Sequence, residues 1–221
     1  MAWLLDGDPA VRWRVLRDLC GAAEPQVTRE RDRVATEGWG ARLLVAQSPD
    51  GNWGGGVYTP KWTSTTYTLL HLLWLGLPAG HPAALRGCER LWEWNDRRRA
   101  PETCVVSMFV RVSLAFGYRS RKVDDAIAFV LDQQQTDGGW NCAARGDRAK
   151  HSSFHTSVLA LEALAGEVST SSWATVYIGH TARARSRSAP AHASRRSRSG
   201  ISTCSAAWNC SRTRPTRATR A

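Results

Sequence analysis

The side chains best suited to chemistry gather between residues 138 and 155. This stretch carries a thiol, a carboxylate and two imidazoles, namely Cys142, Asp147, His151 and His155. His151 and His155 are four residues apart, so they would share one face of a helix. Thiolate, carboxylate and imidazole are the ligand types that zinc prefers. Because the spacing is loose, Cys142, Asp147 and His151 are only weak candidates for metal ligands. The sequence requires no cofactor, and zinc and magnesium both stay open.

The same stretch also contributes positive charge. Arg145 and Lys150 lie between the thiol and the imidazoles, and Lys61 occupies a corresponding place earlier in the chain. Together with the two histidines, these cations predict a polar rim that faces the anionic end of a ligand above an apolar cavity. The alternative is that all of them are solvated loop residues and helix caps.

A repeated motif, Q-x-x-D-G-x-W, indicates how such residues are positioned. It occurs twice, 87 residues apart, as Gln47, Asp50, Gly51, Trp53 and as Gln134, Asp137, Gly138, Trp140. An indole that stacks on the next turn, with a Gln that bonds a helix end, would tie neighbouring helices together. The glycines would supply backbone geometry that other residues rarely adopt. We therefore interpret the eight residues as structural, with Trp140 also a candidate for ligand contact.

The apolar spacing around each motif predicts a helical hairpin. Each copy ends one helix, and a second helix follows it, over residues 63–75 and 152–164. A middle hairpin of helices 82–92 and 103–116 has lost the motif, and a helix from Pro9 to Leu19, capped by Asp8, precedes the array. We predict an all-α domain over residues 1–166 and a separate tail over 167–221.

Through these motifs the chain resembles the terpene cyclase and protein prenyltransferase superfamily, over about residues 3–164. The resemblance is closest to bacterial squalene cyclase-like proteins of uncertain activity. It implies an (α/α) toroid or barrel with an apolar cavity and an isoprenoid or similar apolar ligand. Three hairpins and one helix are fewer than a closed toroid requires, so we expect an incomplete one.

The resemblance does not extend to the acidic motifs of the family. The chain contains neither an Asp-x-Asp-Asp run nor an Asp-rich magnesium motif. In a toroid the starts of the inner helices would surround the mouth of the cavity. Glu102, His151 and His155 are therefore the candidate catalytic residues. The candidate ligand-binding residues are Lys61, Trp62, Cys104, Trp140, Arg145 and Lys150.

The composition fits a cytoplasmic protein. The sequence begins without a signal peptide and contains no apolar run that would span a bilayer, although peripheral membrane contact stays open. Its six cysteines show no C-x-x-C spacing, which favours reduced thiols. The oligomeric state cannot be predicted from these features.

The net charge of +11 is concentrated in the tail. From Ser169 onward there are ten Arg and no Lys, Asp or Glu, which leaves 20 basic against 19 acidic residues in the rest of the chain. The tail has too little apolar surface to fold alone, so we expect it to be disordered. Two interpretations stay open: a basic tail that binds nucleic acid or an acidic surface, or translation in a shifted frame. We favour the frameshift, because suitable codons for residues 201–211 encode an amphipathic helix when they are read in another frame. Under that interpretation the basic tail is not a native segment, and nucleic acid is an unlikely partner.

Three hypotheses for the function follow. The chain is an isoprenoid-handling enzyme or its degenerate remnant, a non-catalytic helical-repeat module that binds lipid or protein, or a protein that binds nucleic acid through its tail. The missing acidic motifs leave enzymatic activity open.

Overall fold

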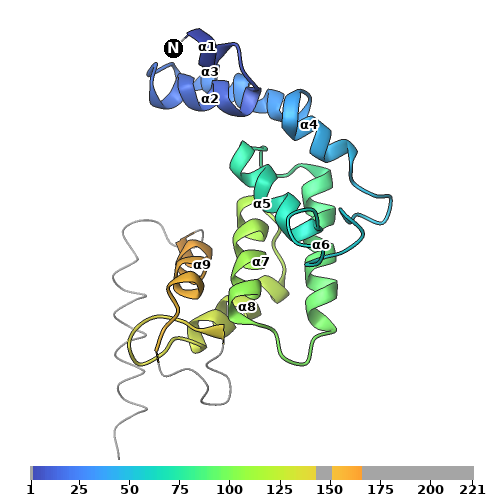
Figure 1. Cartoon of the computed structure of the whole chain (residues 1–221), viewed down its shortest axis with the longest axis vertical. Coiled ribbons are helices and arrows are strands. Elements are labelled where there is room, and N and C mark those ends of the chain that lie inside the picture. The colour runs from blue at the N-terminus through green and yellow to red at the C-terminus, as the bar shows by residue number, and fades with distance from the viewer. Residues whose placement is uncertain (1, 143–150, 166–221) are drawn as a thin grey trace, which may run out of the picture. The chain divides into compact units, whose positions relative to one another are not determined.

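In this computed structural model, residues 2–142 and 151–165 are described, and every regular element within them is a helix (Figure 1). The helices are α1 (Ala2–Leu5), α2 (Pro9–Asp18), α3 (Glu24–Asp32), the 3₁₀ helix η1 (Arg33–Ala35), α4 (Gly38–Val45), α5 (Thr65–Leu75), α6 (Pro82–Asp96), α7 (Thr103–Ala115), α8 (Arg121–Asp132) and α9 (Phe154–Ala165). The predicted all-α class is confirmed. The predicted tail, residues 167–221, lies outside the described residues. Among the helices described, none has the length and apolarity needed to cross a membrane.

Two of the three expected pairs are in contact, α4 with α5 and α6 with α7, whereas α9 packs mainly against α7 and not against α8. The middle pair begins where its apolar pattern begins, at Pro82 and Thr103, although α6 continues four residues beyond its predicted end at Trp92. The helix that begins at Pro9 is also confirmed. The Asp8 side chain accepts a hydrogen bond from the Ala10 amide at 2.9 Å, as an N-cap should.

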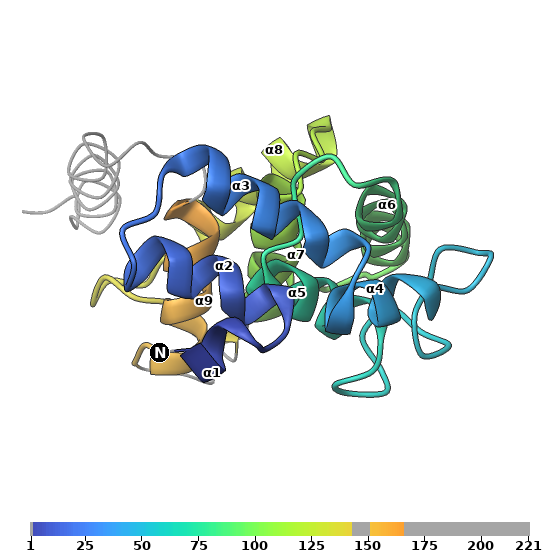
Figure 2. The same cartoon turned by 90° about the horizontal axis from the view of Figure 1, so that it is seen from above.

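Helix α7 occupies the centre of the packing. It contacts α5, α6, α8 and α9 (Figures 1 and 2). Ten of its thirteen residues are buried, among them Phe109 and Val110, which are fully enclosed. The Phe109 ring meets Trp92 of α6 edge to face, with the ring centroids 6.0 Å apart. The apolar character of α7 on nearly every side is therefore explained by its central position.

Helices α2 and α3 close the C-terminal end of α5. The Trp13 indole N–H donates to the Leu75 carbonyl at 2.9 Å, and Arg31 Nε donates to the Gly76 carbonyl at 2.8 Å. Gly76 has φ 96°, and a Cβ there would lie 2.6 Å from the indole nitrogen of Trp13. Only glycine fits this close approach, and the exposed carbonyls of the helix end obtain donors.

Candidate functional site

The two copies of the repeated motif make the same hydrogen bond to the helix that precedes them. Trp53 Nε1 donates to the Leu43 carbonyl near the end of α4, and Trp140 Nε1 donates to the Val130 carbonyl near the end of α8, both at 2.7 Å. Both indoles are 2% exposed. Each Trp therefore satisfies a free carbonyl at a helix end while its ring fills the core.

The glutamine and glycine of each copy also correspond. Gln47 Nε2 donates to the Gly51 carbonyl at 2.9 Å, and Gln134 Nε2 donates to the Gly138 carbonyl at 2.8 Å. The two glycines have φ 88° and 91°, in the left-handed region that favours glycine. The predicted structural role of these four residues is supported by the same bonds at both sites.

The aspartates of the motif stabilise the turn. Asp50 accepts from the backbone and side chain of Asn52, and Asp137 accepts from the Ser152 amide and hydroxyl. These hydrogen bonds to the ionised form lower the pKa of both carboxyl groups. Neither aspartate is therefore available as a proton donor at neutral pH.

Only the first copy bonds to a further helix, α6, within the described residues. Gln47 Nε2 donates to the Ala83 carbonyl of α6 at 2.9 Å, and Gln47 Oε1 accepts from Arg86 at the same distance. The Trp53 ring lies so close to α6 that a Cβ at Gly87 would be 2.8 Å from its Cζ3 atom. The motif thus joins α4 to α6 directly.

Aromatic side chains gather around the starts of helices α5 and α7. We call Tyr58, Trp62, Tyr67 and Trp94 the aromatic cluster. The Tyr67 ring lies 5.8 Å from that of Tyr58 and 5.2 Å from that of Trp62, and Tyr58 lies 6.2 Å from Trp94. These separations are typical of favourable aromatic pairs. Trp62 is 67% exposed, so the cluster reaches the surface.

Charged groups border this cluster. Arg98 lies over the Trp94 ring, 4.5 Å from its centroid, and also pairs with the Glu102 carboxylate at 3.8 Å. Burial is the main cause that raises the pKa of Tyr58, followed by its hydrogen bond to Tyr67 and by the nearby charges of Cys104 and Glu102. The aromatic cluster therefore presents ring faces and two phenols, bordered by a cation and a carboxylate.

A pair of cysteines lies beside the cluster at the first turn of α7. Cys142 Sγ accepts from the Cys104 amide at 3.1 Å and from the Thr156 hydroxyl at 3.6 Å. A hydrogen bond from the Cys104 thiol is the largest cause that lowers the pKa of Cys142 to about 6, and the same contact raises the pKa of Cys104. These contacts therefore favour ionisation of Cys142 before that of Cys104.

The structure brings together some of the predicted site residues and separates others. Trp62, Glu102 and Cys104 all contact or neighbour the tyrosines of the aromatic cluster. Lys61, His151 and His155 are exposed. Arg145, Asp147 and Lys150 lie outside the described residues.

The weak metal candidates gain no support from the described geometry. No group of three or more His, Cys, Asp or Glu residues that could hold a metal ion occurs within residues 2–142 and 151–165. Cys142 contacts Cys104 and Thr156, whereas His151 is exposed and Asp147 is not described.

Sequence reasoning missed Tyr58, Trp94 and Arg98 as site residues. Trp94 lies on the outer helix α6, and Tyr58 lies in the loop before α5, so neither belongs to an inner helix. A signal was present for Arg98, which follows Trp94 at four residues and would lie on the same face of a helical turn. Tyr58 and Trp94 are brought together only by packing between hairpins.

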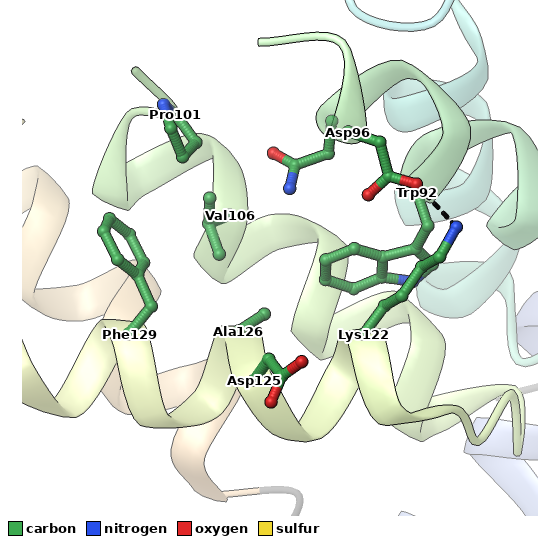
Figure 3. A pocket seen from close by; sticks show the side chains of 9 residues that line it. Trp92, Asp96, Pro101, Val106, Lys122, Asp125, Ala126 and Phe129 are labelled. Carbon is green, nitrogen blue, oxygen red and sulfur yellow. Dashed lines mark hydrogen bonds and ion pairs between the residues drawn. The ribbon is translucent and has the colours of Figure 1, made fainter. Parts of the chain in front are cut away.

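A separate cavity of about 250 Å³ lies between α6, α7 and α8 (Figure 3). Trp92, Val106 and Phe129 supply its apolar side, and the Lys122–Asp96 ion pair at 2.6 Å crosses its edge. None of the predicted site residues lines it. Its volume is below the roughly 300–1,000 Å³ of ordinary ligand pockets, so it is too small for a long apolar ligand.

No family model, curated protein or solved structure matches this chain. The geometry of the aromatic cluster and of the repeated motif must therefore carry the argument for function.

Proposed function

We propose that the helical domain is part of an incomplete α/α toroid of the kind found in squalene cyclase-like proteins. The inner helices would be α5, α7 and α9, and the outer helices α4, α6 and α8. Contacts of α7 with both α5 and α9 support this order. The equivalent bonds of Trp53 and Trp140 support a true structural repeat.

The function that we propose is binding of an apolar, isoprenoid-type ligand by the aromatic cluster. The observation that carries it is the set of four neighbouring rings at the inner-helix starts, which ends in the exposed Trp62. Ring faces bind apolar chains and also stabilise positive charge. Arg98, with Lys61 in the same loop region as Trp62, would attract an anionic end such as a diphosphate.

Glu102 is the group best placed for any chemistry on such a ligand. Its carboxylate lies beside Arg98 and close to Tyr58, where it would stabilise positive charge that develops next to the rings. His151 and His155, which were predicted as its partners, are exposed. We therefore propose ligand binding as the primary activity, with Glu102 as the first residue to test for turnover.

Calorimetric titration with farnesyl and geranylgeranyl diphosphate tests this proposal. Trp62→Ala should weaken binding about tenfold, which corresponds to about 1.4 kcal/mol. Binding and turnover of the same diphosphates are then measured separately in the variants Glu102→Ala, His151→Ala and His155→Ala. The matched control is Trp39→Ala, because Trp39 is also exposed, at 53%, but belongs to α4. Equal weakening by both Trp variants, or no binding by a folded sample, would contradict the proposal.

An apolar surface on α9 favours a second candidate function, a non-catalytic module that binds lipid or protein. Phe154 is 87% exposed and Leu161 is 37% exposed on this helix. Exposed apolar groups on one element are typical of interaction surfaces. A folded chain that binds neither diphosphate, yet loses binding to lipid vesicles after Phe154→Ser, would favour this candidate.

Nucleic-acid binding by the tail depends on the sequence alone. Truncation after Gly166 should abolish any salt-sensitive binding, because it removes all ten arginines of the tail. Binding that survives truncation would exclude the tail as its cause.

A further inference from the structure

Two cysteines from different hairpins meet at the first turn of α7. Cys104 is the second residue of that helix, and Cys142 follows the second copy of the motif by two residues. The Cys142 sulfur accepts from the backbone amide of Cys104 at 3.1 Å. This contact places the Cys142 sulfur directly beside the residue that carries the second thiol.

The surroundings give the two sulfurs different roles. Cys142 Sγ receives two donors, namely the Cys104 amide and the Thr156 hydroxyl. An amide at a helix N-terminus also contributes the positive end of the helix dipole. The nearby Glu102 carboxylate opposes this effect, but it is half-exposed and paired with Arg98. Cys142 is therefore the nucleophile, and Cys104 keeps its proton.

We propose that Cys104 and Cys142 form a peroxide-responsive thiol pair that closes to a disulfide between α7 and the loop after the second motif. The Cys142 thiolate attacks one oxygen of a hydroperoxide, so an S–O bond forms while the O–O bond breaks and hydroxide leaves. The Cys104 sulfur then attacks the sulfenic sulfur of Cys142. An S–S bond forms, the S–O bond breaks, and water leaves with the Cys104 proton. The two thiols lose two electrons to the peroxide.

The other described cysteines offer an internal comparison. Cys88 is fully buried in α6, and burial raises the pKa of its thiol to about 12. Cys20 is exposed after the end of α2. Cys204 and Cys210 lie outside the described residues. The proposal therefore predicts one specific pair among six cysteines, rather than general oxidation of exposed thiols.

Peptide mapping of the full chain tests the pair directly. The protein is treated with one equivalent of hydrogen peroxide at pH 7, blocked with N-ethylmaleimide under denaturing conditions and digested with trypsin. Cys104 and Cys142 fall in separate tryptic peptides, 100–111 and 123–145. We expect these peptides to appear joined, two hydrogen masses lighter than their sum, and to separate again after dithiothreitol. Cys20 and Cys88 should carry the maleimide.

Two variants assign the roles, in a chain that also carries Cys204→Ser and Cys210→Ser. In Cys104→Ser, Cys142 should stop at the sulfenic acid, which dimedone traps. In Cys142→Ser, Cys104 should remain a thiol. Circular dichroism checks that each variant is folded, and the mapping of the unaltered chain needs no variant. The proposal is overturned if the joined peptide is absent, if Cys142 pairs with another cysteine or another chain, or if Cys104 is oxidised in Cys142→Ser.

Discussion

Trp62 has an exposed ring and an unusual backbone conformation. It has φ 72°, the one positive φ among the described non-glycine residues, and its side chain is 67% exposed. The left-handed region costs an ordinary residue about 1–2 kcal/mol relative to glycine. The exposed ring recovers little of this cost by burial, so the strained backbone is compatible with the proposed role of Trp62 in ligand contact.

Two substitutions that both remove the Trp62 ring measure the energetic cost of its backbone conformation. Trp62→Gly should be more stable than Trp62→Ala by about 1 kcal/mol, because only glycine adopts positive φ without strain. Urea denaturation measures the difference. Trp39 supplies the control, since it lies in helix α4, where glycine should instead be less stable than alanine by up to about 1 kcal/mol. The same sign at both positions would argue against a strained backbone at Trp62.

Single-residue geometry was predictable where the residue type dictates it. The positive φ of Gly51 and Gly138 and the cap at Asp8 follow from the chemistry of glycine and aspartate. The start of α5 does not follow from residue type in this way, because Ser64 makes no capping bond. The amides of Thr65 and Thr66 bond instead to the carbonyls of Gly56 and Val57, which belong to a loop whose path no local pattern reveals.

At the scale of elements, the first motif joins helices α4 and α6 through one tight contact. The Trp53 indole is bonded to α4 and fills the space in front of Gly87 on α6. A Cβ at Gly87 would lie 2.8 Å from Trp53 and 3.2 Å from both methyl groups of Leu69. The absence of a side chain at Gly87 is therefore what lets the indole lie between the two helices.

A double-mutant cycle tests this contact. Gly87→Ala should lower the free energy of unfolding by about 1–3 kcal/mol through overpacking, despite the better helix propensity of alanine. In a Trp53→Leu background the smaller side chain leaves room for the Cβ, so the same change should cost nothing or stabilise by up to about 1 kcal/mol. Equal effects in both backgrounds would exclude a clash with the indole.

The elements themselves were predictable when they carry an apolar stripe with clear end signals, as α2, α6 and α7 do. Helix α3 was missed because only Val27 among its nine residues is buried. Its contribution is the bond from Arg31 to the end of α5, 45 residues away. Contacts between residues far apart in the sequence were likewise not predictable at the site. Cys104 and Cys142 are 38 residues apart and meet only once the helices pack.

For the whole molecule, the sequence pattern led to the correct class and to two packed pairs, α4 with α5 and α6 with α7, but α9 packs mainly against α7 and not, as expected, against α8. The closure of these pairs into a toroid rests on the resemblance and stays a prediction. Its physical requirement is that the inner helices pack side by side. Helix α7 contacts both α5 and α9, as this requirement demands of the three helices proposed to be inner.

The central position of α7 predicts a gradient of stability through the molecule. Ten residues of α7 are buried, against one in α3 and none in α1. Amides in the interior of α7 should therefore exchange with deuterium only through global unfolding, whereas those of α1 and α3 should exchange through local opening. Exchange followed by mass spectrometry in low urea measures both. Urea should accelerate exchange in α7 strongly, because global unfolding exposes much more surface than local opening, and should affect α1 little. Exchange of α7 at the rate of α1 would show that the hairpins open independently, and the array would then lack the shared core that an assembly of inner helices requires.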